Sequence, residues 1–176
     1  MALAATIAAC VAALVSLVNV FATSWLGRHS LRQQWRREAE RPIVAAFLSC
    51  SDQCLEAWND AALSKQAWIN SFETGHEEHR KRSHDDMVSA HETGSSLVEK
   101  MTTHVAELDL VAGSEVCRTT KQLLKHHCSI RHMIRPAGAA GDPYQAFRSQ
   151  RAEIDKLRTT VVKTSRADIG VALKPK

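Results

Sequence analysis

The hydrophobic and polar positions divide the chain into an uncharged opening stretch and four segments with helical periodicity. Residues 1–27 contain no Asp, Glu, Lys, Arg or His, and large apolar residues are scattered there among alanines. A helix of about 20 apolar residues is long enough to cross the hydrocarbon core of a bilayer. The pattern therefore predicts a transmembrane anchor over 1–27.

Beyond the opening stretch, apolar residues recur at spacings of three and four, which is typical of amphipathic helices. Arg41-Pro42 interrupts the first pattern, so we expect a new helix to begin there, and the polar run 76–86 predicts a turn or frayed connection. The predicted helices cover about 43–73, 84–110, 114–134 and 144–167, with a linker at 137–143 before the last one.

The apolar stripes of these helices predict one shared core. The stripe of the first helix includes Trp58 in its middle and Trp68, Ile69 and Phe72 at its end. His127 falls within the stripe of the third helix, so we interpret it as a hydrogen-bonded core or boundary residue. The expected fold is all-α, with an N-terminal transmembrane helix followed by an antiparallel four-helix bundle or coiled-coil-like domain. The expected divisions are 1–27 (anchor), 28–41 (basic juxtamembrane segment), 42–170 (bundle) and 171–176 (tail).

The arginines that follow the opening stretch predict its orientation. Five arginines lie within 28–41, diluted by Glu38 and Glu40, and none precedes the stretch. The positive-inside bias then favours a cytoplasmic C-terminal domain. A cleavable signal peptide is the alternative, because Val20-Phe21-Ala22 resembles a cleavage site, but signal peptides carry a basic segment before the apolar one.

Segment 28–41 either lies along anionic lipid headgroups or continues the span as an ordinary helix, and both interpretations stay open. Tryptophan favours the headgroup layer, and each arginine near an anionic surface adds attraction. The residues predicted to meet the lipid surface are Trp25, Arg28, Arg32, Trp35, Arg36 and Arg37.

Composition agrees with a helical bundle and gives little indication of a nucleic-acid partner. Aromatic residues supply only 5% of the chain, and the formal net charge of +4 is too mild for nucleic-acid binding along its whole length. The five cysteines make an odd set without the spacing of a secreted scaffold, which indicates reduced thiols facing a cytosol.

Histidines and cysteines raise the hypothesis of a metal or redox site. Zinc needs three or four converging ligands, and His76-Glu77-Glu78-His79 lacks the H-E-x-x-H spacing of a metalloprotease helix. Cys54 lies on the apolar stripe, where cysteine is usually a small buried hydrophobe. We expect no metal, no cofactor and no catalytic residue. The residues that the metal or redox alternative would use are Cys50, Cys54, His76, His79, His84 and His91.

A basic stripe follows the third predicted helix, roughly opposite its apolar face. Such a stripe would dock an acidic partner, lipid headgroups or a line of phosphates, although a charge run is usually a solvated face. The residues predicted for partner binding are Arg118, Lys121, Lys125, His132 and Arg135.

Four stretches carry a resemblance to known proteins: 17–26 (LVNVFATSWL), 41–48 (RPIVAAFL), 106–116 (AELDLVAGSEV) and 165–171 (SRADIGV). They resemble small bacterial single-span, membrane-anchored helical-bundle proteins of unassigned function. The similarity runs over most of the chain and lapses over 73–95. It implies a membrane-anchored bundle and brings no catalytic residues with it.

Taken together, the patterns favour a non-enzymatic, membrane-tethered helical interaction or scaffolding module that binds a protein partner or self-associates beside the inner leaflet. One alternative is a metal- or redox-responsive membrane-anchored sensor. Another is an envelope-associated coiled stalk with reversed topology, and a third is a hydrolase whose site has no recognisable motif.

Overall fold

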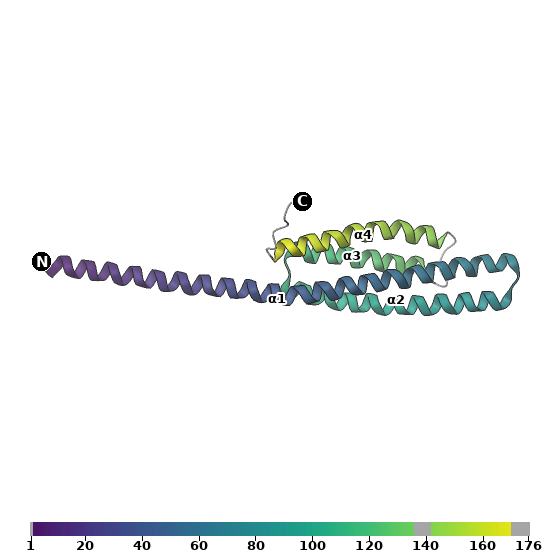
Figure 1. Cartoon of the computed structure of the whole chain (residues 1–176), viewed down its shortest axis with the longest axis horizontal. Helices are drawn as coiled ribbons and strands as arrows, with labels where there is room; N and C mark the ends of the chain where they lie inside the picture. The colour runs from purple at the N-terminus through teal and green to yellow at the C-terminus, as the bar shows by residue number, and fades with distance from the viewer. Residues whose placement is uncertain (1, 136–141, 170–176) are drawn as a thin grey trace. The chain divides into compact units, whose positions relative to one another are not determined.

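The computed structural model describes the backbone of residues 2–135 and 142–169. Within these ranges, the side chains of 2–15, 17, 18, 20, 22, 24–26, 28, 29, 32, 73 and 74 are not described. Every regular element of the described residues is a helix, so the predicted all-α class is confirmed. The helices are α1 (Ala2–Thr74), α2 (Glu77–Val111), α3 (Ser114–Met133) and α4 (Pro143–Asp168), as Figure 1 shows.

The chain forms two compact units, Met1–Glu38 and Ala39–Lys176. The described part of the first unit is the opening portion of α1, and the second unit contains the rest of α1 with α2, α3 and α4. Among the residues that the structure describes, no helix is long and apolar enough to cross a membrane. Most side chains of the anchor predicted over 1–27, and the tail over 171–176, lie outside the described residues.

Helix α1 continues through Pro42, so the helix start predicted at Arg41-Pro42 is wrong. Proline has no N–H to donate to the carbonyl of Glu38, and this loss usually kinks or ends a helix. Here the Pro42 side chain is exposed, while Val44 and Phe47 on the next turn are buried in the core. Burial of this apolar face holds the turn in helical form despite the missing hydrogen bond.

The polar run 76–86 is helical from Glu77 onward, which corrects the turn or frayed connection predicted there. Between α1 and α2 lie only Gly75, with a φ of 71°, and His76. Two carboxylates, Glu77 and Glu78, occupy the first turn of α2, where the helix dipole favours negative charge. This polar segment is therefore helical for two reasons. The carboxylates of its first turn suit a helix N-terminus, and its inner face packs on α1.

The four helices of the second unit pack antiparallel in sequence order. Hydrogen bonds join each neighbouring pair: Cys54 to Gly94 for α1–α2, His91 to Arg131 for α2–α3, His126 to Gln150 for α3–α4, and Ser165 to Glu40 for α4–α1. Consequently α1 runs parallel to α3 across the bundle, with Ser51 beside His127. This is the arrangement expected of an up-down four-helix bundle.

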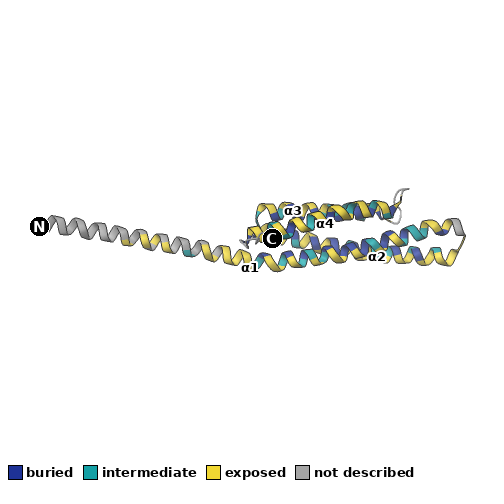
Figure 2. Cartoon of the chain, turned by 45° about the horizontal axis from the view of Figure 1, so that its top comes forward, coloured by how far each residue is buried: buried dark blue, intermediate teal, exposed yellow. Residues whose placement is uncertain are grey.

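The apolar stripes predicted for the four helices meet in one core (Figure 2). Phe47, Leu123 and Ile154 are fully buried, each from a different helix. Trp58 is also fully buried, and its ring lies so close to α2 that a Cβ at Gly94 would come within 2.8 Å of it. The core is thus closely packed where α1 crosses α2.

Candidate interaction surface at the hairpin tip

The end of the α1–α2 hairpin extends past the end of α3, as Figure 1 shows. Buried Lys65 marks the level at which α3 ends, because its Nζ donates to the carbonyl of Arg135 at 2.8 Å and to that of Met133 at 3.4 Å. Burial lowers the pKa of Lys65. Residues 66–74 of α1 and the first turns of α2 therefore form a two-helix projection, which we call the hairpin tip.

Aromatic side chains gather on the hairpin tip. Trp68 and Phe72, one helical turn apart on α1, meet edge to face with ring centroids 5.1 Å apart. On α2, His84 lies 5.9 Å from the Trp68 ring, and the Arg80 guanidinium lies 5.1 Å from the centre of the Phe72 ring. Such contacts favour a fixed arrangement of the rings even without a covering helix.

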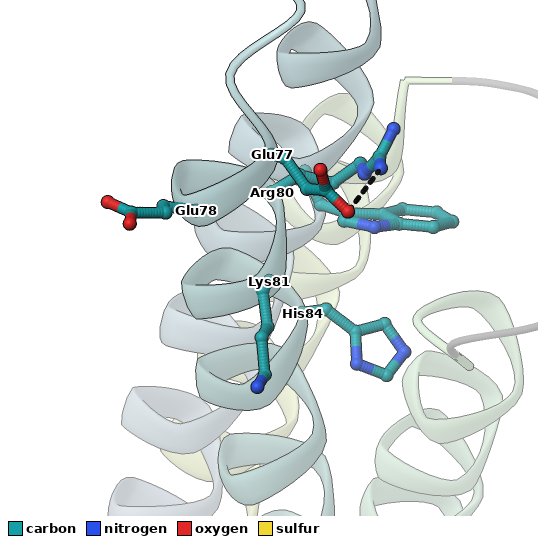
Figure 3. Close-up of a pocket in the computed structure, with 6 residues that line it drawn as sticks. Glu77, Glu78, Arg80, Lys81 and His84 are labelled. Carbon is teal, nitrogen blue, oxygen red and sulfur yellow. Dashed lines mark ion pairs between the residues drawn. The ribbon is translucent and has the colours of Figure 1, made fainter.

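A shallow pocket of about 480 Å³ opens beside these rings. Figure 3 shows the Glu77 carboxylate facing the Arg80 guanidinium, 4.0 Å away, while the Glu78 carboxylate points away from both. Lys81 and His84 line the same pocket from the next turn of α2 (Figure 3). The pocket combines an aromatic wall with charges of both signs.

Two apolar residues of the hairpin tip are exposed, which corrects their assignment to a buried stripe. Ile69 is 36% exposed and Phe72 57% exposed. Their spacing on α1 continues the pattern of the core residues. They are exposed because α3 and α4 are too short to cover this end of α1. Sequence periodicity does not contain that information.

Ser51 and His127 form a polar contact inside the core. The Ser51 Oγ lies 2.9 Å from the His127 Nε2, and both residues are fully buried. Burial, with smaller contributions from Arg158 and His126, lowers the pKa of His127 to about 3. The interpretation of His127 as a hydrogen-bonded core residue is confirmed. A neutral ring without access to solvent is suited to fixing how α1 and α3 pack and poorly suited to general-base catalysis.

The cysteines of the metal or redox alternative occupy the core or its edge. Cys54 is fully buried and donates its thiol hydrogen to the Gly94 carbonyl at 3.6 Å, while Cys50 and Cys128 are half-buried. Burial raises the pKa of the Cys54 thiol to about 12. A thiol with this pKa is almost wholly protonated at neutral pH and is a poor nucleophile and metal ligand.

The histidines of the same alternative are spread over the first half of α2, from its N-cap at His76 to His91. His76 and His79 are exposed at its start, His84 contacts Trp68, and His91 stacks edge to face on Trp58 with centroids 5.5 Å apart. Within the described ranges, no three His, Cys, Asp or Glu side chains come together as a metal site. The expectation that the chain holds no metal stays a prediction.

The basic stripe predicted for partner binding is partly neutralised by the chain's own acids. Arg118 donates to Glu115 one turn earlier on α3, and the Lys121 Nζ lies 2.7 Å from Asp109 of α2. The hydrogen bond between them raises the pKa of Lys121 and lowers that of Asp109. The other three residues of the stripe, Lys125, His132 and Arg135, are exposed.

The structure describes the side chains of only some of the residues predicted to meet lipid. The side chains of Trp25, Arg28 and Arg32 lie outside the described residues, whereas Trp35, Arg36 and Arg37 are exposed. Segment 28–41 is helical throughout. Its interpretation as a lipid-facing segment stays a prediction.

Comparisons with protein-family models, curated protein sequences and solved structures found no match. The resemblance to single-span bacterial bundle proteins therefore stays a prediction.

Proposed function

We propose that the protein is a membrane-tethered helical interaction module, in which the opening segment anchors the chain and the four-helix bundle binds a protein partner. The observation that carries the proposal is the absence of acidic and basic side chains over 1–27, followed at once by an arginine-rich segment. An uncharged helix of this length is favourable in a bilayer, and the arginines after it favour a cytoplasmic bundle.

The hairpin tip is the proposed docking surface for the partner. Exposed Phe72 contacts Arg80, which lines the pocket together with Glu77 and Lys81. Ile69, also exposed, precedes Phe72 by three residues on α1. Protein interfaces commonly combine an apolar centre with a polar rim and are enriched in aromatic residues and arginine. Charges of both signs suit a protein surface better than a uniformly anionic lipid or nucleic acid.

The tip also lies at the far end of the bundle from Ala39, where the second unit begins. The portion of α1 between Ala39 and Thr74 amounts to roughly 50 Å of helix. A partner at the tip would thus bind well away from the junction with the opening segment.

The proposal predicts that a photo-crosslinking residue at position 72 of the full chain, in native membranes, captures one discrete protein. Introducing Ile69→Asp into that chain should lower the capture by about tenfold, because a charge would be buried at the centre of the interface.

Leu110 provides the matched control, because it is 84% exposed and lies at the opposite end of α2. A crosslinker at position 110 should not capture the same protein, and Leu110→Asp should leave capture at position 72 unchanged. Equal capture from both positions, or no capture from position 72, would contradict the proposed docking surface.

A further inference from the structure

The hairpin tip resembles half of a four-helix bundle that lacks its other two helices. Ile69 and Phe72 continue the apolar stripe of α1 past the end of α3, and both are exposed. In the body of the bundle, α3 and α4 cover the corresponding side chains of α1. The tip therefore presents an apolar surface of the kind that two further helices cover in a complete bundle.

The two helices of the tip are in register around the turn that joins them. Helix α1 ends at Thr74 and α2 begins at Glu77, so Phe72 stands at about the level of His79. Two contacts agree with this register. The Arg80 guanidinium lies over the Phe72 ring, and His84 lies beside Trp68, one turn further from the end of the hairpin.

Charges are arranged symmetrically about His79. Glu77 and Glu78 precede it, whereas Arg80 and Lys81 follow it, and these four charged side chains all line the pocket of the tip. Within one copy they are poorly paired. Glu77 and Arg80 are 4.0 Å apart, and among the described side chains neither Glu78 nor Lys81 belongs to an ion pair. A segment with acids before its centre and bases after it is complementary to a second copy of itself that runs in the opposite direction.

We infer that the partner of the hairpin tip is a second copy of this chain, bound through a two-fold contact in which two tips lie side by side in opposite directions. The inference rests on the proposed function, because it names the partner of the same docking surface. A two-fold axis at the level of Phe72 sets Glu77 of one copy opposite Lys81 of the other. It likewise sets Glu78 opposite Arg80. Each pair occurs twice, as in any contact between identical surfaces.

The same axis brings the apolar parts of the two tips together. It passes between the two Phe72 rings, and Ile69 of each copy lies about one turn away on α1. Each α1–α2 pair then covers the apolar surface that α3 and α4 leave exposed in the other copy. An aromatic centre with charged neighbours is typical of protein interfaces. A polyanion such as nucleic acid would satisfy the cations of the tip and leave its carboxylates unpaired.

The test uses the purified full chain in a mild detergent, where each copy turns freely and two tips can meet in any direction. A photo-reactive phenylalanine analogue replaces Phe72, and isotope-labelled and unlabelled chains are mixed. Irradiation should yield an adduct of twice the chain mass that contains both isotopes. The link should join position 72 to residues 66–84 of the other copy. The same analogue at position 110, where exposed Leu110 lies at the opposite end of α2, should yield no such adduct.

Charge reversal tests the register of the two tips. Glu77→Lys and Lys81→Glu should each lower the yield of the adduct by about tenfold, because like charges then face each other at two places in the contact. An equal mixture of the two variants should recover the wild-type yield, and so should the chain that carries both changes. Recovery in the mixture also requires that each variant folds. Glu99→Lys, which reverses an exposed acid of α2 outside the tip, should leave the yield unchanged.

The outcomes separate the self-pairing from the docking surface itself. If position 72 captures a different protein in native membranes while the purified chain yields no adduct, the self-pairing is refuted and the docking surface is retained. No adduct from position 72 in either setting refutes both. Equal adducts from positions 72 and 110, or no recovery in the mixture of charge variants, also overturn the self-pairing.

Discussion

Replacing Gly94 with alanine will destabilise the bundle by about 1–3 kcal/mol, the usual cost of overpacking a close-packed core. Glycine inside an exposed helix is normally the weaker choice by up to about 1 kcal/mol relative to alanine. Here the sign reverses, because the new methyl group would lie 2.8 Å from the ring of fully buried Trp58. Because Trp58 is fully buried among core residues, we expect α1 and α2 to move apart to admit the methyl group.

Urea denaturation of the full chain in a mild detergent, followed by circular dichroism, measures this loss. Trp58→Phe, which removes the ring atoms that the methyl group meets, should make the Gly94→Ala change less costly than it is in the wild type. Gly27→Ala is the matched control, because no atom lies within 4 Å of a Cβ built there. Additive effects of the Trp58 and Gly94 changes would contradict the close approach.

Acid will weaken the fold through His127. The pKa of this residue is about 3 in the folded chain, against about 6.5 for an unperturbed histidine in the unfolded chain. Between these values the unfolded state binds a proton that the folded state does not. Stability is therefore lost as pH falls from about 6.5 towards 3, with a slope of up to about 1.4 kcal/mol per pH unit.

Denaturation midpoints measured across this pH range for the wild type and for His127→Leu test the assignment. The variant should lose a slope equivalent to about one proton, although its stability at neutral pH also changes with the loss of the Ser51 contact. His132→Leu, an exposed histidine on the same helix, should keep the wild-type slope. An identical slope in the wild type and His127→Leu would show that another group is responsible.

The parts of the fold that sequence predicts well are those set by periodicity. The stripe of Leu123, His127 and Ile130 identified both the buried face of α3 and a histidine that needs a hydrogen-bonding partner. Two helix starts were predicted wrongly, at Arg41-Pro42 and at residue 84, whereas the other predicted helix ends lie within one residue of those observed. Pro42 is a helix breaker by local propensity, yet the burial of Val44 and Phe47 keeps α1 continuous. Tertiary packing keeps α1 helical at Pro42, and a local sequence pattern carries no information on tertiary packing.

The candidate sites show the same division between local and long-range information. The basic stripe on α3 is visible in sequence, but the pairing of Lys121 with Asp109 depends on how α2 and α3 align. Likewise, Ile69 and Phe72 have the spacing of core residues and are exposed only because α3 ends near Lys65. Lys65 itself gave no signal of burial, since its role depends on carbonyls at the end of another helix.

The most direct test of the tether is carbonate extraction of native membranes that contain the full chain. If residues 1–27 span the bilayer, the intact protein, with these residues still attached, stays in the membrane pellet after the alkaline wash. A bundle recovered in the supernatant, or a mature chain that lacks the opening stretch, would contradict the account.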